Sequence, residues 1–273
     1  MIKFVVRDLS RRDYSIMRDQ SQIATAYPLA HSSPVVYNAF VITDIFYDIE
    51  TKELIDPSAT DPDAAIRALH MSVGASWCAC HEAQFFHSTA ALAEHLLAHD
   101  RIVGFSILHF DNAVLAWSLE RHIEESFDPV TGKHIIHKPL PDEPEALKKL
   151  LDDKSFDVST YLETRLGHKV GLGALAEGTF GRQKLATGPQ AVVWNRLVVT
   201  LRDKWPFALA DVGDQEGAAR VNELGAWFQE RLEQYCLQDA LLVKKIYEYG
   251  VANKRVAYID FESERRVVKV QWR

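Results

Sequence analysis

The first core strand of this protein is predicted by the stretch AFVITDIFYDIETKEL, residues 39–54. Its apolar residues indicate a core strand over about 39–49, and two carboxylates, Asp48 and Glu50, stand at its end. Side chains two positions apart on a strand point to the same face, about 7 Å apart. Two acids on one face repel each other unless water or a cation relieves the repulsion. The pair therefore predicts part of a divalent-metal site.

The composition is that of an ordinary soluble globular protein, with 273 residues of which 47% are hydrophobic and 25% are charged. No apolar run approaches the roughly 20 residues of a membrane helix, and the opening MIKFVVRDLS lacks the architecture of a signal peptide. Three cysteines cannot all pair with one another, so we expect reduced thiols and a cytoplasmic protein. The net charge of −7 argues mildly against coating nucleic acid by bulk electrostatics.

The order of the predicted elements indicates an α/β domain with a mixed sheet. After the first core strand we expect a hairpin of two strands at about 70–79 and 82–87, and then a helix at about 90–99 capped by Ser88 or Thr89. A buried strand at about 101–106 and a helix at about 112–123, opened by Phe110 and Asp111, follow. The proline-rich region 124–154 is expected to be a loop with one short helix. A brief strand in SFDV (155–158) and a helix that ends at Gly167 follow.

The longest periodic segment, about 219–250, predicts a long helix with Gly250 as its C-terminal cap. The stretch FALADVGDQEG (207–217) before it predicts a turn-rich connection. The alternation in RVAYIDFESERRVVKVQW (255–272) predicts a hairpin of two strands.

Two further acids and a tyrosine complete the predicted site. On the long helix, Tyr235 and Asp239 are four residues apart and share a face. That face is apolar, so its carboxylate is unfavourable unless it is paired or bound to a metal. Asp111 stands at the start of a helix directly after a strand, where the helix dipole favours an anion. With Asp48 and Glu50 these acids predict an all-oxygen site for Mg²⁺ or Mn²⁺.

Three segments, FYDIET, IVGFSILHFDNAVL and LEQYCLQDALLVKKIYEYG, resemble in order the three exonuclease motifs of the DEDD superfamily, within the ribonuclease H-like fold. The tyrosine four residues before the last aspartate resembles the DEDDy branch, which includes the proofreading domains of family A and B DNA polymerases. The middle segment is most similar to ribonuclease H-like domains found beside some helicases, and LGHKVGLGALAEGTFGRQK is similar to that group as well. The resemblance covers about 39–250.

The resemblance implies a mixed central sheet with one antiparallel strand, flanked by helices. It also implies a 3′–5′ exonuclease that acts on single-stranded 3′ ends, with DNA slightly preferred over RNA, and a helicase or polymerase as partner. Its cofactors would be two divalent cations, Mg²⁺ or Mn²⁺. Asp48, Glu50 and Asp239 would hold the ion that binds the attacking water. Asp48 would bridge to a second ion bound by Asp111, and Tyr235 would orient the water.

The resemblance also sets the expected domain organisation, with an N-terminal extension over 1–38, the exonuclease domain over 39–250 and a hairpin over 251–273 packed on that domain. The chain departs from the family's pattern in two places. Ser106 stands where an asparagine is usual after Gly-Phe, and the segment 198–222 is longer than the usual connection. We interpret that segment as an insertion for substrate gating or partner binding.

Two other functions remain open. One is a nuclease-like module without efficient catalysis, which binds nucleic acid or a helicase or polymerase partner. The other is an endonuclease on the same fold, although the helix-borne Tyr-x-x-x-Asp argues against it.

Three other features invite weaker interpretations. Asp44 shares the strand parity of Asp48 and Glu50 but is expected at the far end, about 13 Å away. Asp157 is expected to be a structural acid near the sheet edge. The cluster Cys78-Ala-Cys80-His81 suggests zinc, but we find no second ligand pair at finger-like spacing, and alternation along a strand explains it better.

Overall fold

The computed structural model describes the structure of residues 43–56, 58–119, 126–128, 133–135, 140–181 and 188–272. The expected N-terminal extension over 1–38 lies outside the described residues, as does the part of the predicted first core strand before Thr43. None of the described helices combines the length with the apolar character that a membrane crossing requires.

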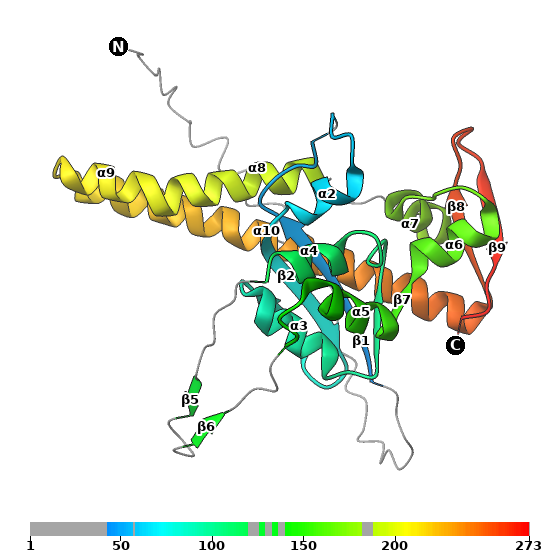
Figure 1. Cartoon of the computed structure of the whole chain (residues 1–273). Helices are drawn as coiled ribbons and strands as arrows, with labels where there is room; N and C mark the ends of the chain where they lie inside the picture. Colours follow the sequence, from blue (N-terminus) through cyan, green and yellow to red (C-terminus); the bar gives the residue numbers. More distant parts are fainter. Residues whose placement is uncertain are drawn as a thin grey trace, which may run out of the picture. The chain divides into compact units, whose positions relative to one another are not determined.

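A mixed five-stranded sheet in the order β3-β2-β1-β4-β7 forms the core (Figure 1). Its strands are β1 (Asp44–Thr51), β2 (Met71–Cys78), β3 (Glu82–Phe86), β4 (Arg101–Gly104) and β7 (Ser155–Asp157). β2 pairs antiparallel with β1 and with β3, whereas β4 pairs parallel with β1 and with β7. One strand therefore runs against the other four, and the predicted α/β class with a mixed sheet is confirmed.

β1 lies at the centre of the sheet because both of its faces are apolar over most of its length. Ile45, Tyr47 and Ile49 are at most 4% exposed and point to one face, where they pack with helical residues within 89–97, 111–117 and 144–154. Phe46 points to the other face and packs with residues of later helices, among them the long helix α10 (Gln215–Asn253). Asp48 has the parity of Phe46, so it faces α10.

Helices cover both faces of the sheet (Figure 1). The described helices that flank it are α2 (Pro62–Arg67), α3 (Thr89–Leu97), α4 (Asp111–Trp117), α5 (Pro144–Lys154), α6 (Val158–Leu166), α7 (Leu172–Phe180), α8 (Gly188–Val198) and α10 (Gln215–Asn253). Ser88 caps α3 by accepting the Ala91 N–H, and Gly167 ends α6 with a φ of 74°, both as predicted.

Asp44 stands at the first position of β1, as far from Asp48 as expected. Arg101 of β4 donates to both of its carboxylate oxygens, from Nη2 at 2.7 Å and from Nε at 2.8 Å. This two-point pairing ties the start of β1 to β4 at the end of the sheet away from Asp48.

The segment 198–222 is helical, and the prediction of a turn-rich connection over 207–217 is wrong for most of its length. α8 continues through the π-helical segment η2 (Val199–Lys204) into α9 (Trp205–Asp211). Only two residues form the turn that follows, and Gly213 in this turn has a φ of 82°. Asp214 then caps α10 by accepting the Gly217 N–H at 2.8 Å. The two helical runs lie side by side as a hairpin (Figure 1).

α10 is longer than the predicted helix over 219–250, and the prediction of Gly250 as its C-terminal cap is wrong. Gly250 lies within the helix, where an added Cβ would come within 2.1 Å of the Trp272 ring. Glycine is therefore required here by close packing and not by a turn. Lys254, with a φ of 56°, occupies the cap position instead.

The predicted C-terminal hairpin is confirmed as β8 (Arg255–Ile259) and β9 (Arg265–Lys269). It packs against α7, and the Ala257 N–H donates to Thr179 Oγ1 at 3.0 Å. The region predicted as a loop with one short helix contains α5 and also a short antiparallel pair, β5 (Ser126–Asp128) with β6 (Lys133–Ile135).

Candidate metal centre

Asp48 and Glu50 come from the end of β1, on the face that packs against α10. Glu50 is 7% exposed, although it stands one residue before the strand ends. Phe46, on the same face, packs its ring 5.8 Å from that of Tyr247 on α10. The alternation of the strand therefore delivers both predicted acids to the surface between β1 and this helix.

Asp239 reaches the same place from the buried face of α10. One carboxylate oxygen from each of Asp48, Glu50 and Asp239 lies within 4.8 Å of the other two. The Cys236 thiol donates to the main-chain carbonyl of Asp48 at 3.1 Å, which holds this turn of α10 against β1 across 188 residues of sequence. Three of the four predicted metal ligands therefore form one carboxylate cluster, in which Glu50 and Asp239 are buried and Asp48 is half-buried.

Asp111, the fourth predicted ligand, lies beside that cluster. The pairing of β1 with β4 ends at Phe46 and Val103, and farther along β1 the Ile49 N–H donates to Asp111 Oδ1 at 3.2 Å. Ile49 is the residue between the two acids of β1, so Asp111 approaches them from the β4 side. Its oxygens are not among those that lie within 4.8 Å of one another.

A chain of hydrogen bonds fixes the start of α4, the helix that carries Asp111. The Tyr47 hydroxyl donates to Asn112 Oδ1. Asn112 Nδ2 in turn donates to Asp152 Oδ1 at 2.8 Å and to Ser155 Oγ at 3.1 Å. Because Asn112 is fully buried, these bonds fix the first turn of the helix and the position of its neighbour.

Burial raises the pKa of Asp111 to about 7, and the charges of Asp157 and Asp239 act in the same direction. Without a bound cation, the Asp111 carboxyl group is therefore partly protonated at a pH of about 7. A divalent cation bound here would favour the carboxylate instead, so metal and proton would compete for Asp111.

We expect metal-free Asp111→Asn protein to gain more stability over the wild type at about pH 8 than at about pH 5. The folded pKa of about 7 exceeds the ordinary value of 3.8, so the stability linked to this proton is complete at low pH. It is lost as the pH rises through about 7. Asparagine stays neutral throughout. The measurement is the midpoint of thermal unfolding in EDTA at both pH values.

The matched control is Asp153→Asn, which changes an exposed acid paired with Lys149. It should shift the midpoint equally at the two pH values. An Asp111→Asn shift that is also independent of pH would contradict the raised pKa.

Tyr235 lies one turn before Asp239 on α10, and it is 5% exposed. Burial raises the pKa of its hydroxyl, and the charge of Asp239, those of Glu50 and Asp48 and a hydrogen bond with Asp239 raise it further. The hydroxyl therefore keeps its proton at neutral pH and can donate it in a hydrogen bond. Trp194 of α8 packs edge-on against the Tyr235 ring, with centroids 6.0 Å apart. No local sequence signal marks Trp194 as a neighbour of the site.

Ser106 lies in the turn between β4 and α4 with a φ of 65°. Asparagine tolerates this left-handed conformation better than serine does, which gives a physical reason for the asparagine in the family's pattern. Asp157 holds the turn by accepting the Ser106 N–H at 2.9 Å and the Leu108 N–H at 3.1 Å. Asp157 ends the edge strand β7 and is the structural acid that was predicted.

The donor set of this cluster consists of carboxylate oxygens alone. Oxygen donors of this kind suit hard divalent cations such as Mg²⁺ and Mn²⁺. The mutual repulsion of three close carboxylates gives a further reason for a cation to bind between them. Asp48, Glu50 and Asp239 could therefore hold a divalent cation.

A second cluster of possible metal ligands contains Cys78, His81, His95 and His99. The expectation that no second ligand pair accompanies Cys78 and His81 is therefore wrong. The signal in the sequence is the spacing His-x-x-x-His, which places two rings on one side of a helix end.

Fold and site together define an α/β protein with a mixed sheet and a carboxylate cluster at the end of its central strand. Comparisons of the chain with protein families, with curated proteins and with solved structures each find no match. The chemistry of the site is therefore the basis for assigning a function.

Proposed function

We propose that this protein is a metal-dependent 3′–5′ exonuclease of the DEDDy type, which hydrolyses phosphodiester bonds at single-stranded 3′ ends. The observation that carries the proposal is the approach of Asp48, Glu50 and Asp239 within 4.8 Å of one another. Two of these acids come from a strand end and the third from a helix far along the chain. Such convergence is unfavourable for folding unless a cation or substrate makes use of it.

The surrounding fold supports the proposal. The sheet has one reversed strand, β2, as the resemblance to the ribonuclease H-like fold implies. Asp111 begins α4 beside the strand that carries Asp48 and Glu50, and Tyr235 lies one turn from Asp239 on α10. This arrangement supports the assignment of the five residues to the three motifs.

The chain's own groups would divide the work of hydrolysis. Asp48, Glu50 and Asp239 would hold one divalent cation, and Asp48 with Asp111 would hold a second. Bound cations at such a site activate water and stabilise the leaving oxygen of a phosphodiester. The Tyr235 hydroxyl, which keeps its proton, would donate a hydrogen bond that orients the attacking water. Direct attack by water needs no covalent enzyme intermediate.

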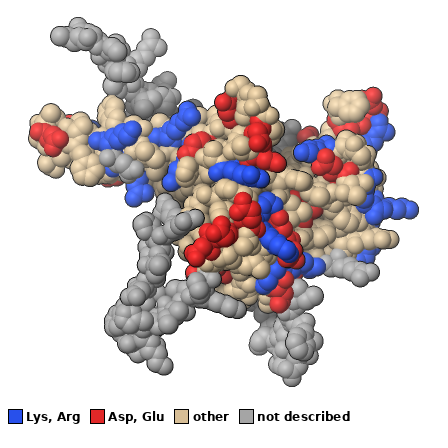
Figure 2. All heavy atoms as spheres, viewed as in Figure 1, with Lys and Arg blue, Asp and Glu red and all other residues tan. Residues whose placement is uncertain are grey.

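The surface charge does not favour long-range attraction of a nucleic acid. On the face shown in Figure 2, basic and acidic side chains of the described residues lie interspersed. With a net charge of −7, long-range attraction to a polyanion is weak. Contacts with a few phosphates at the metal centre would supply the affinity, and we propose DNA as the slightly preferred substrate over RNA.

The test uses single-stranded DNA and RNA labelled at either the 3′ or the 5′ end. With Mg²⁺ or Mn²⁺, the 5′-labelled strand should shorten stepwise, while the 3′-labelled strand should release labelled mononucleotide at once. EDTA should stop both. If neither strand shortens from its 3′ end in either metal, the proposal fails, and cleavage of closed circular DNA would indicate an endonuclease.

A nuclease-like module with weak catalysis, which binds nucleic acid or a helicase or polymerase partner, is the second candidate. The observation that favours it is the exposure of apolar side chains around α9, where Trp205 is 53%, Phe207 68% and Val212 77% exposed. Retention of labelled DNA without any shortening of the strand would support this candidate over the exonuclease.

A further inference from the structure

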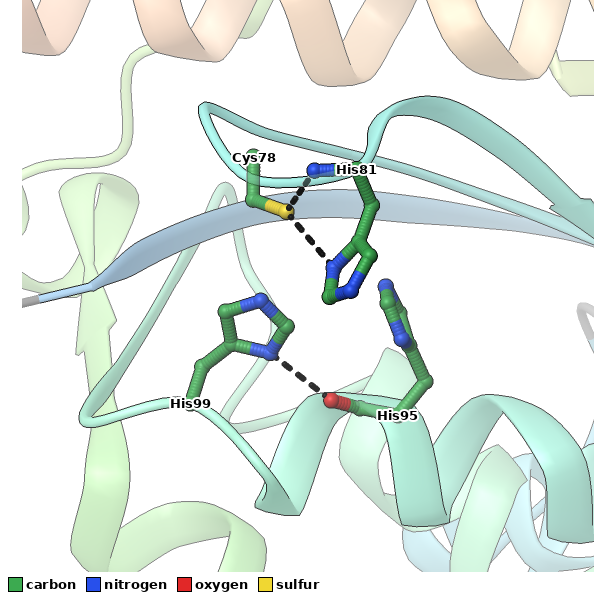
Figure 3. Close-up of side chains that lie close together, drawn as sticks. All are labelled: Cys78, His81, His95 and His99. Carbon is green, nitrogen blue, oxygen red and sulfur yellow. Dashed lines mark hydrogen bonds between the residues drawn. The ribbon is translucent and has the colours of Figure 1, made fainter.

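Four possible metal ligands, one cysteine and three histidines, meet at the end of the sheet where β1 begins. Cys78 is the last residue of β2, and His81 lies in the turn that follows. His95 lies in the last turn of α3, and His99 follows the end of that helix. One donor atom from each lies within 4.8 Å of all the others. Figure 3 shows the sulfur and the three rings directed toward one another from the turn and the helix.

The hydrogen bonds of the rings leave suitable nitrogens directed into the cluster. His99 Nδ1 lies 2.8 Å from the His95 carbonyl oxygen, and since a carbonyl can only accept, this nitrogen carries the proton (Figure 3). Its Nε2 is therefore the available donor to a metal. Such a bond from the far nitrogen is the usual support of a metal-ligating histidine.

His95 supplies an independent observation. Its Nε2 is a buried nitrogen that has no hydrogen-bond partner among the described residues. A buried polar atom of this kind is unfavourable unless an unseen group satisfies it. The ring lies 5.0 Å from that of His99 and 5.3 Å from that of His81, measured between centroids. A metal ion among the three rings would satisfy this nitrogen.

The separation of Cys78 and His81 fits tetrahedral coordination. Zinc bonds of about 2.3 Å to sulfur and 2.1 Å to nitrogen separate two ligand atoms by roughly 3.5 Å. Cys78 Sγ lies 3.4 Å from His81 Nδ1. The His81 N–H also donates to that sulfur at 3.3 Å, which stabilises a thiolate. The spacing, Cys-x-x-His followed by His-x-x-x-His, is that of a finger-type site with histidine in place of the second cysteine.

We infer that Cys78, His81, His95 and His99 form a structural zinc site. Four protein ligands close the coordination of the ion, which is typical of a structural zinc. The ion would join the turn between β2 and β3 to the end of α3 and so fasten the edge of the sheet. Cys78 pairs with Ile45, three residues before Asp48 on β1, so the site is separated from the carboxylate cluster by about 10 Å of strand.

The donor atoms separate the two sites chemically as well. Sulfur and imidazole nitrogen select zinc, whereas the carboxylate oxygens around Asp239 select harder cations. Cys80 is a further donor close to this cluster, with its sulfur 2.9 Å from that of Cys78, 3.2 Å from His81 Nδ1 and 3.5 Å from His99 Nε2. The test must therefore distinguish the two cysteines.

The test is the metal content of untagged full-length protein purified without chelator and measured by mass spectrometry of the elements. We expect close to one zinc per chain. Cobalt replacing it should give the thiolate-to-metal absorption and the intense visible bands of tetrahedral coordination. Cys78→Ser and His95→Gln should each weaken zinc binding by more than the roughly 10- to 100-fold loss typical of an outer-shell partner.

Three variants serve as controls and should keep the zinc. His87→Gln changes a histidine at the end of β3 away from His81, which bonds Glu233 instead. Cys80→Ser changes the neighbouring thiol, and Asp239→Asn changes the carboxylate cluster. Loss of zinc with Cys80→Ser but not with Cys78→Ser overturns the ligand set. Wild-type protein that takes up no zinc, or cobalt without thiolate absorption, overturns the site itself, even where variants fail to fold. A disulfide between Cys78 and Cys80, detected by counting thiols in the unfolded chain, overturns it too.

Discussion

Asp239→Asn is expected to lower the rate of the proposed 3′-end hydrolysis by roughly 10³-fold or more, since the loss of a metal ligand would remove several kcal/mol of transition-state stabilisation. Asparagine has nearly the same shape as aspartate, but it removes one of the three charges that meet within 4.8 Å. Its amide oxygen is a weaker donor to a cation, and its amide nitrogen would repel one. The measurement is the rate of shortening of 5′-labelled single-stranded DNA in Mg²⁺ and in Mn²⁺.

The matched control is Glu233→Gln, which changes an acid on the same helix. Glu233 bonds His87 at 3.1 Å and Gln229 at 2.9 Å, outside the carboxylate cluster. It should leave the rate unchanged. In EDTA, Asp239→Asn should unfold at the same temperature as the wild type or higher, because one repulsive charge is gone. A stable Asp239→Asn protein that retains the wild-type rate would show that hydrolysis does not use this cluster.

Trp272→Ala is expected to destabilise the protein by about 3–5 kcal/mol, the usual loss for a large buried aromatic side chain. Trp272 is 1% exposed. Its ring stacks on that of Tyr247 at 5.7 Å between centroids and meets those of Phe156 and Tyr161 edge-on at 6.0 and 5.9 Å. Alanine would leave a cavity over Gly250, which has no side chain to fill it.

The loss should appear as a decrease of roughly 10 °C or more in the midpoint of thermal unfolding. Phe261→Ala is the control, because Phe261 is 95% exposed and its removal should change the stability by less than about 0.5 kcal/mol. Trp272→Phe should cost less than Trp272→Ala, since it keeps a ring and removes the indole nitrogen, which is buried without a partner among the described residues. Equal midpoints for Trp272→Ala and the wild type would contradict this packing.

Local pattern was sufficient for the elements that carry the candidate site. The alternation of β1 put Asp48 and Glu50 on one face, and the periodicity of α10 put Tyr235 and Asp239 on its buried face. The strand pair β2–β3 and the hairpin β8–β9 were predicted from alternation and turn residues. These features depend on neighbours within a few residues, so the sequence contains them directly.

Predictions from local sequence pattern were wrong where glycine or aspartate can have more than one structural role. Gly213 does make a turn, yet Gly250 makes room for Trp272 within a helix. Asp211 belongs to α9, whereas Asp214 caps α10. The composition of 207–217 therefore indicated a loop where the structure has a helical hairpin. The role that each glycine or aspartate takes depends on its contacts with distant parts of the chain.

The sequence by itself determined which faces of β1 and α10 are buried, because the periods of strand and helix are local properties of the backbone. Only the tertiary structure decided which of those faces meet. It brought Asp239 to Asp48, and it brought His95 and His99 to Cys78. Neither contact is indicated by the sequence around any one of these residues. Such meetings depend on the packing of the whole core, in which every element limits the positions open to the others.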